Sequence, residues 1–77
     1  MLAILYSNGS QECDRLLSLF DNLEQKFIEY KLDRDFTMKE FVSEFGDEAT
    51  FPQVAIGFNH IGGLKETLQY YQQRDLL

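Results

Sequence analysis

Short apolar stretches alternate along the chain with polar turn residues, and the spacing changes between strand and helix periods. Residues 2–6 are almost wholly apolar, which is typical of a central strand covered on both faces. After a polar cluster at 7–10, apolar residues recur at helical spacing and predict a helix over 11–25, with Ser10 as its N-cap. Residues 27–32 predict a second strand. Because a strand-helix-strand crossover joins parallel strands, these two strands are expected to be neighbours.

The second half of the chain predicts a short helix, a hairpin and a last helix. Thr37 and Glu40 form a capping box that begins the short helix, and Gly46 is placed to end it. Residues 53–56 predict a third strand, and a turn at 57–59 leads into a short return strand. The last helix follows two glycines, and its apolar face is predicted to consist of Leu64, Leu68 and Tyr71. The predicted order is β-α-β-α-β-β-α.

Composition and charge narrow the class of protein. The 77 residues carry seven Lys and Arg against thirteen Asp and Glu, a net charge of −6. Such a chain has no basic footprint for phosphate groups, so neither nucleic acid nor an anionic membrane is an expected partner. With 44% hydrophobic residues and one cysteine, residues 1–77 are expected to form a single domain without a disulfide. The absence of a leader pattern and of a spanning apolar run predicts a cytoplasmic protein.

Three local features carry candidate chemistry. They are the helix start Ser10-Gln11-Glu12-Cys13, the tripeptide Thr50-Phe51-Pro52 and the run His60-Ile61-Gly62-Gly63. Together they resemble the glutaredoxin family, which places Cys-x-x-Cys at the first helix, Thr-x-Pro with a cis proline before the third strand, and Gly-Gly before the last helix. The resemblance implies an α/β thioredoxin-like (glutaredoxin) fold, with a four-stranded mixed sheet flanked by helices. It also implies a cis peptide bond before Pro52.

The chain departs from the family at the position of the attacking cysteine, which is Ser10. A thiolate at a helix N-terminus is stabilised by unpaired N–H groups and the helix dipole, whereas a serine hydroxyl without a base stays protonated. Ser10 is therefore interpreted as an N-cap at the position of the family nucleophile. Cys13 shares the apolar stripe of the helix and resembles the resolving thiol; it is either redox-active or a small core residue. A natural replacement and an engineered one give the same sequence.

The resemblance also implies glutathione as co-substrate. In the family, backbone beside the cis proline pairs with the tripeptide, and the glycine pair lets a helix N-terminus receive its γ-glutamyl carboxylate. The residues thereby assigned to glutathione or substrate binding are Tyr6, Thr50, Phe51, Pro52, Gly62, Gly63, Leu64 and Lys65. Lys65 stands where the family usually has an acidic residue for the γ-glutamyl amine, so that contact is missing.

No metal and no iron–sulfur cluster is expected. The cluster that some glutaredoxins bridge is held by the first cysteine of the motif, which this chain lacks. His60 is the only histidine, and no Cys, His or Asp cluster with metal-ligand spacing accompanies it. His60 is therefore interpreted as a residue of the hairpin.

Two functions follow from this sequence. The first is a glutathione-dependent thiol–disulfide oxidoreductase, an electron carrier in redox homeostasis that acts on protein disulfides, with activity impaired or altered by Ser10. The second is a redox-inactive module that binds glutathione or a peptide. The alternative to both functions is a plain α/β domain in which the motifs occur by chance. Electron delivery to ribonucleotide reductase enters by family analogy alone. The protein is expected to be a monomer. Rapid alkylation of Cys13 near neutral pH would favour the oxidoreductase.

Overall fold

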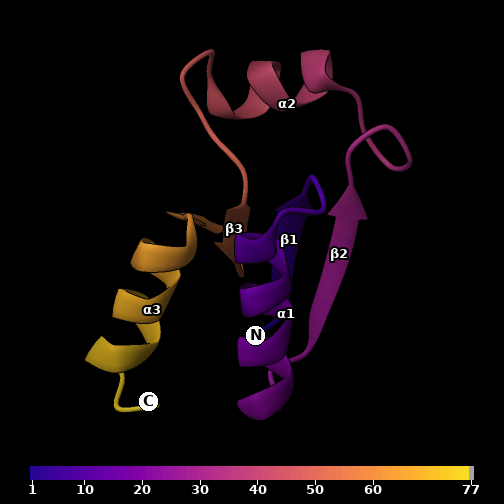
Figure 1. The fold of residues 1–77 in the computed structure, drawn as a ribbon. Helices are drawn as coiled ribbons and strands as arrows, with labels where there is room; N and C mark the ends of the chain where they lie inside the picture. The colour runs from indigo at the N-terminus through magenta and orange to yellow at the C-terminus, as the bar shows by residue number, and fades with distance from the viewer. Residues whose placement is uncertain (77) are drawn as a thin grey trace.

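The computed structural model describes residues 1–76, so Leu77, the last residue of the predicted domain, lies outside the described residues. Within residues 1–76 the elements are β1 (Ala3–Ser7), α1 (Gln11–Asn22), β2 (Phe27–Lys31), α2 (Met38–Phe45), β3 (Gln53–Ile56), β4 (Asn59–Gly62) and α3 (Leu64–Gln73). Figure 1 shows their path from indigo to yellow. The predicted order of elements is confirmed, and their bounds differ from the prediction only at the ends of elements.

The largest difference is at the end of α1, which was predicted to reach residue 25 and stops at Asn22. Glu24 has a φ of 54°, in the left-handed region that ends a helix. The Gln25 N–H then bonds the Phe20 carbonyl at 2.8 Å, and the Glu24 N–H bonds the Asp21 carbonyl at 3.1 Å. These two bonds form a Schellman motif around a residue other than glycine, which is why the apolar periodicity did not reveal it.

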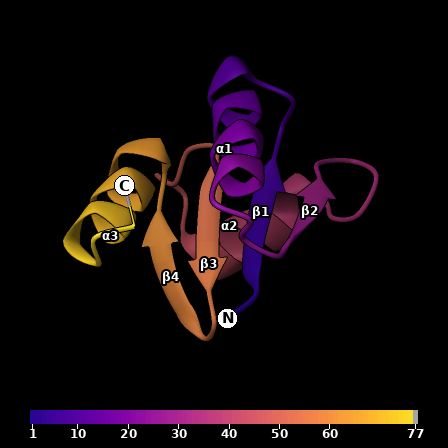
Figure 2. The same cartoon turned by 90° about the horizontal axis from the view of Figure 1, so that it is seen from below.

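The four strands form one mixed sheet in the order β2-β1-β3-β4. β1 pairs in parallel with β2 and antiparallel with β3, and β3 pairs antiparallel with β4. The central place of β1 and its parallel pairing with β2 confirm the crossover predicted from the sequence. Figure 2 shows α1 crossing in front of this sheet, with α2 behind it.

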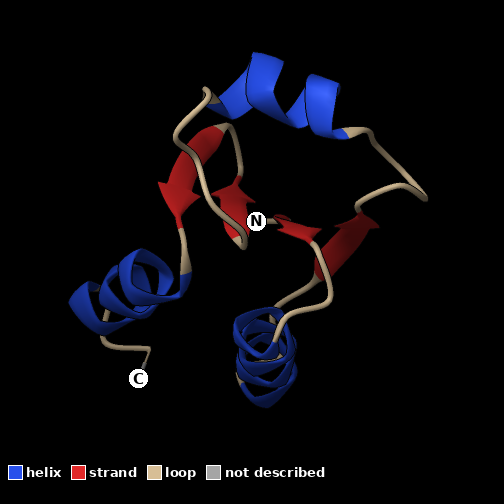
Figure 3. Ribbon diagram, turned by 45° about the horizontal axis from the view of Figure 1, so that its top comes forward, coloured by secondary structure: helices blue, strands red, loops and turns tan. Residues whose placement is uncertain are grey.

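One face of the sheet carries the main apolar core. α1 and α3 lie on this face, and α2 lies across the opposite face (Figure 3). Alternate residues of β1 point toward α1 and α3, as the two-residue period of a strand requires. The core residues on this face are at most 2% exposed; they are Ala3, Leu5, Leu16, Phe20, Val54, Ile56 and Tyr71.

The opposite face carries an aromatic layer beneath α2. Its members are Tyr6, Phe36, Phe41, Phe45 and Phe51, whose neighbouring ring centroids are 4.1 to 6.0 Å apart. Stacked and edge-to-face rings at such distances contribute beyond their buried area. These side chains therefore attach α2 to the sheet.

The ends of α2 follow the sequence prediction. The Thr37 hydroxyl accepts the Glu40 N–H at 3.2 Å, and the Glu40 carboxylate accepts the Thr37 N–H at 2.9 Å. Both halves of the predicted capping box are thus present. Gly46 is the C-cap residue, with a φ of 97° that favours glycine.

The apolar face predicted for α3 is wrong in part. Leu68 is 37% exposed, whereas Thr67 and Tyr71 are the buried residues of this helix. The Tyr71 hydroxyl donates to Gln25 Oε1 at 3.0 Å, which holds the Thr67 and Tyr71 side of α3 toward the sheet. Leu68 therefore faces the space between α1 and α3. Of the helices in residues 1–76, none has the length and apolar character needed to cross a membrane.

Candidate functional site

The three sequence motifs meet at one end of the sheet. β1 ends there and leads into α1, and antiparallel β3 begins there because Tyr6 pairs with Gln53. β4 ends at the same place, since Val54 pairs with Gly62. A Cβ atom added to Gly63 would lie 3.4 Å from the carbonyl oxygen of Pro52. Gly63 therefore packs directly on the proline loop.

The start of α1 is built around the Ser10 hydroxyl. Ser10 is the N-cap, as predicted, and its Oγ accepts the Cys13 N–H at 3.4 Å. The same hydroxyl donates to Cys13 Sγ at 3.2 Å. The Cys13 thiol in turn donates to Asn8 Oδ1 at 3.6 Å. The thiol thus lies in a small polar ring made by the loop that precedes the helix.

This ring changes the acidity of Cys13. Burial raises the pKa of the thiol, but hydrogen bonds from the side chains of Ser10 and Ser7 and from the backbone of Asn8 and Ser10 lower it by more. The net pKa of Cys13 lies below its ordinary value of 9.0. The thiol is nevertheless 0% exposed. The site therefore favours the thiolate but hides its sulfur from solvent.

The proline loop places backbone at the site and side chains elsewhere. The Phe51–Pro52 peptide bond is cis, which confirms the expectation for Pro52. Pro52 is buried, and Thr50 is exposed. The Phe51 ring stacks on Phe41 of α2 with centroids 4.1 Å apart. Because the Phe51 ring belongs to the aromatic layer, it is the main chain of this loop that can pair with a peptide.

The start of α3 is occupied by a side chain of its own helix. The Glu66 carboxylate accepts the N–H of Gly63, the N-cap, at 2.9 Å. Gly62 has a φ of 125°, and a Cβ there would lie 2.9 Å from Cβ and Cγ of Glu66. Leu64 is half-buried and Lys65 is exposed. An N–H group expected to receive a ligand carboxylate therefore already has an anionic partner.

The sequence by itself matches no protein-family model and no curated protein. Solved structures do match. A buckwheat glutaredoxin in complex with glutathione has 25% identity and a TM-score of 0.79, over 96% of this chain and 71% of that one. Glutaredoxin 1 from Francisella tularensis, complexed with cacodylate, has 25% identity and a TM-score of 0.72, over 97% and 95%. Reduced Escherichia coli glutaredoxin shares the fold at 18% identity and a TM-score of 0.79, over 95% of both chains.

The chain is a glutaredoxin-like protein. Its sheet order and three helices confirm the expected α/β thioredoxin-like fold. In this glutaredoxin-like protein, three separate parts of the chain gather at one end of the sheet. They are the start of α1 with Ser10 and Cys13, the loop with Pro52, and the junction of β4 and α3 with Gly62 and Gly63.

The structure does not place the Tyr6 side chain on the same face of the sheet as Cys13. Its neighbours in β1, Leu5 and Ser7, are buried on the face of α1. Tyr6 therefore points to the opposite face, where its ring centroid is 5.0 Å from that of Phe45 in α2. Burial raises the pKa of Tyr6, with smaller contributions from Glu44 and Tyr30. Its position indicates a role in the aromatic layer.

Sequence reasoning missed two partners in this site. Asn8 entered the prediction only as part of the polar cluster at 7–10, yet its side chain accepts from both the Cys13 thiol and the Ser10 N–H. Glu66 was not assigned to the site. Each carried a signal, because Asn in a polar turn commonly bonds nearby groups, and a Glu three residues after an N-cap commonly reaches back to it.

Residues 1–76 contain no group of three or more His, Cys, Asp or Glu side chains that could hold a metal ion. His60 lies on β4, where its Nε2 is 3.2 Å from a carboxylate oxygen of Glu44 in α2. His60 therefore joins the hairpin to α2 through an exposed polar contact with Glu44 and through ring packing on Phe45, with centroids 4.7 Å apart.

Proposed function

We propose that this glutaredoxin-like protein is a glutathione-dependent thiol–disulfide oxidoreductase that works through a single thiol, Cys13. The observation that carries the proposal is the hydrogen-bonded Cys13 sulfur in the first turn of α1, with its pKa below the ordinary value. A buckwheat glutaredoxin of the same fold was solved in complex with glutathione, which supports glutathione as the co-substrate. The proposed place of action is the reducing cytoplasm, where thiols persist.

A single thiol can complete the exchange when glutathione supplies the second one. The Cys13 thiolate attacks the glutathione sulfur of a protein–glutathione mixed disulfide, and the protein thiolate leaves and takes up a proton. The product is a disulfide between Cys13 and glutathione. A second glutathione thiolate attacks the glutathione sulfur of that disulfide, forms glutathione disulfide and restores the Cys13 thiolate. The Ser10 hydroxyl donates to the sulfur whenever it is ionised.

The rate of this exchange is limited by access to the sulfur. Cys13 is 0% exposed and is covered by its own loop, in which Asn8 and Gly9 are exposed. Attack therefore requires local opening of residues 8–10, and the rate falls with the fraction of molecules that are open. In addition, Ser10 stands at the position where a dithiol glutaredoxin has its attacking cysteine. Reduced activity follows from both features.

Glutathione is proposed to lie along the main chain beside Pro52, with its γ-glutamyl end near Gly63 and Leu64. A main-chain pairing of this kind does not depend on side chains, so it tolerates Phe51 turning toward α2. The Glu66 carboxylate competes with the ligand carboxylate for the Gly63 N–H. Weak binding of glutathione is the expected result.

One observation favours a second function, a redox-inactive module that binds glutathione or a peptide. The complete burial of Cys13 is what a structural cysteine on an apolar helix stripe would show. In that case the proline loop and the start of α3 would bind a partner without sulfur chemistry.

Alkylation of native Cys13 by iodoacetamide across pH 6–10 separates the two functions. For the oxidoreductase we expect modification of the folded protein, with a rate that rises to a plateau at an apparent pKa below 9.0. The control is a Cys13→Ser variant, which must show no modification and no reduction of a glutathionylated peptide. Modification that begins only in denaturant would contradict the oxidoreductase and support the binding module.

A further inference from the structure

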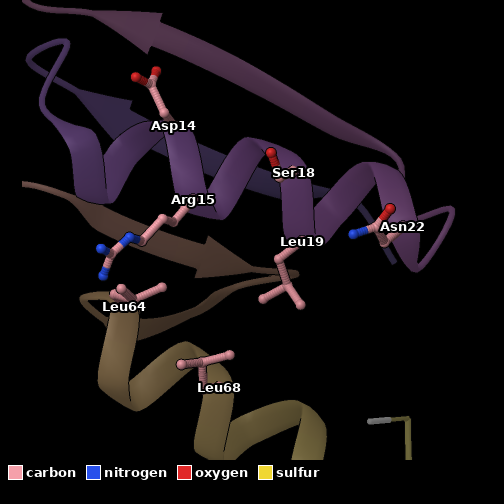
Figure 4. Close-up of a pocket in the computed structure, with 7 residues that line it drawn as sticks. All are labelled: Asp14, Arg15, Ser18, Leu19, Asn22, Leu64 and Leu68. Atoms are coloured by element: carbon pink, nitrogen blue, oxygen red, sulfur yellow. The ribbon is translucent and has the colours of Figure 1, made fainter.

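A groove lies between α1 and α3 on the outer side of the molecule, beside the candidate active site. Its volume is about 480 Å³, within the usual range for ligand pockets. Figure 4 shows the side chains that line this α1/α3 groove. They are Asp14, Arg15, Ser18, Leu19, Asn22, Leu64 and Leu68.

The floor of the α1/α3 groove is aliphatic. Leu19 of α1 points toward Leu68 of α3, and Leu64 lies at the end of the groove where α3 begins (Figure 4). Leu68 is 37% exposed, although its neighbour Thr67 is 0% exposed. Three leucines that meet at a surface between two helices can bury further apolar side chains.

One end of the groove carries a positive charge. The Arg15 side chain extends from α1 toward Leu64, whereas the Asp14 carboxylate points away from α3 (Figure 4). Within residues 1–76, the close contacts between basic and acidic side chains are Arg34 with Asp35 and His60 with Glu44, so Arg15 has no acidic partner there. The N-cap N–H of α3 already has the Glu66 carboxylate as its partner, so the positive charge at this end of the groove comes from the Arg15 guanidinium. In a chain with a net charge of −6, this end of the groove complements a carboxylate.

The groove is continuous with the candidate active site. Leu64 is the first residue of α3 and directly follows Gly63, which packs on the Pro52 carbonyl. A segment lying along Leu64 and Leu68 therefore extends away from the proline loop. This arrangement suits a bound peptide that runs from the proline loop along α3.

We propose that the α1/α3 groove binds an apolar peptide segment that carries an acidic side chain. Leucine-like side chains of the segment cover Leu19, Leu64 and Leu68, and its carboxylate binds the Arg15 guanidinium. The inference extends the proposed function, and rests on it for the partner's identity: the segment belongs to the protein whose mixed disulfide is exchanged. The groove thereby selects among protein substrates by the residues near their cysteine.

The binding test uses two synthetic peptides without cysteine, acetyl-Leu-Leu-Asp-amide and acetyl-Leu-Leu-Asn-amide, titrated into the ¹⁵N-labelled protein by NMR. We expect shift changes in α1 and α3 around the groove, with the Asp peptide bound roughly five-fold more tightly. Arg15→Gln should remove the preference for Asp. Leu68→Asp should weaken both peptides roughly ten-fold, because it removes apolar area from the groove. The added carboxylate also repels the Asp peptide, so that peptide should lose more affinity than the Asn peptide.

The matched control is Gln69→Asp, which adds the same charge to α3 at an exposed position outside the groove lining and should leave binding unchanged. Equal affinity for the two peptides, a preference that survives Arg15→Gln, or no shift changes at millimolar peptide would each overturn the proposal. Line broadening that grows with protein concentration alone would assign the groove to a second copy of the chain instead. Since neither peptide contains sulfur, failure of the Cys13 chemistry and failure of the groove are distinguishable.

Discussion

The two helices on the same face of the sheet begin in opposite ways. At the start of α1, the neutral hydroxyl of Ser10 accepts the Cys13 N–H and donates to the Cys13 sulfur. At the start of α3, the charged carboxylate of Glu66 accepts the Gly63 N–H. Both starts lie at the same end of the sheet, and each follows a glycine with positive φ.

The difference shows how one side chain decides whether a helix start can receive an anion. The N–H groups and dipole of a helix favour negative charge in every case. A neutral cap leaves part of that field for a thiolate, and the lowered pKa of Cys13 is consistent with this. An anionic cap from the same helix partly neutralises that field, so less of it acts on a ligand. In this protein the start of α1 stabilises a charged sulfur, whereas the Gly63 N–H at the start of α3 has an anionic partner before any ligand binds.

The largest expected effect comes from placing a thiol at the half-buried start of α1. Ser10→Cys should raise the rate of reduction of a glutathionylated peptide by roughly 10²-fold, because a thiolate at that position is stabilised and is more accessible than the buried Cys13 sulfur. The control is the double variant with Cys13→Ser, which should keep most of the gain through glutathione. An inactive Ser10→Cys protein with an unchanged circular dichroism spectrum would contradict the assignment of this position.

The glycines before the two helices should differ in cost when replaced by alanine. Gly62→Ala combines a φ of 125° with a Cβ 2.9 Å from Glu66, and should lower the free energy of unfolding by about 3 kcal/mol. Gly9→Ala has a φ of 81° and nothing within 4 Å of its Cβ, and should cost about 1 kcal/mol. Urea denaturation measures both values. Equal costs would show that Glu66 moves aside for the methyl group added at position 62.

Removing the anionic cap of α3 should make the two starts more alike. Glu66→Ala frees the Gly63 N–H and removes a negative charge, so the affinity for reduced glutathione should rise several-fold. The same change should cost about 1 kcal/mol of stability through loss of the cap. Glu66→Gln keeps an acceptor without the charge and should give a smaller gain. Calorimetric titration with glutathione measures the effect, and an unchanged affinity for the Ala variant would exclude competition by Glu66.

The smallest expected effect concerns the pKa of Cys13. Ser10→Ala removes the donor to the sulfur and should raise this pKa, whereas Ser10→Thr keeps a hydroxyl and should restore it. Because the folded pKa is lowered, ionised Cys13 adds stability that is fully present above 9.0 and is lost as pH falls through the lowered pKa. Ser10→Ala should flatten this dependence. Alkylation rates and urea melts between pH 7 and 10 measure both effects, and an unshifted rate profile would argue against the hydrogen bond.

Much of the fold could be predicted because its signals lie within a few residues. The capping box at Thr37 and Glu40, the N-cap at Ser10 and the end of α2 at Gly46 each depend on local hydrogen bonds and backbone angles. The parallel pairing of β1 with β2 follows from the crossover rule. The cis bond before Pro52 was expected from the family resemblance, which joins motifs far apart in the sequence.

What the sequence by itself determined is the order of the elements, their caps and the chemistry available at positions 10 and 13. Tertiary structure alone decided that Tyr6 faces α2, that Leu68 lines a groove and that Cys13 is fully covered. The physical reason is that helical and strand periods state which residues share a face, but not which way that face turns. That direction depends on packing between segments distant in the sequence, such as the bond from Tyr71 to Gln25 that orients α3.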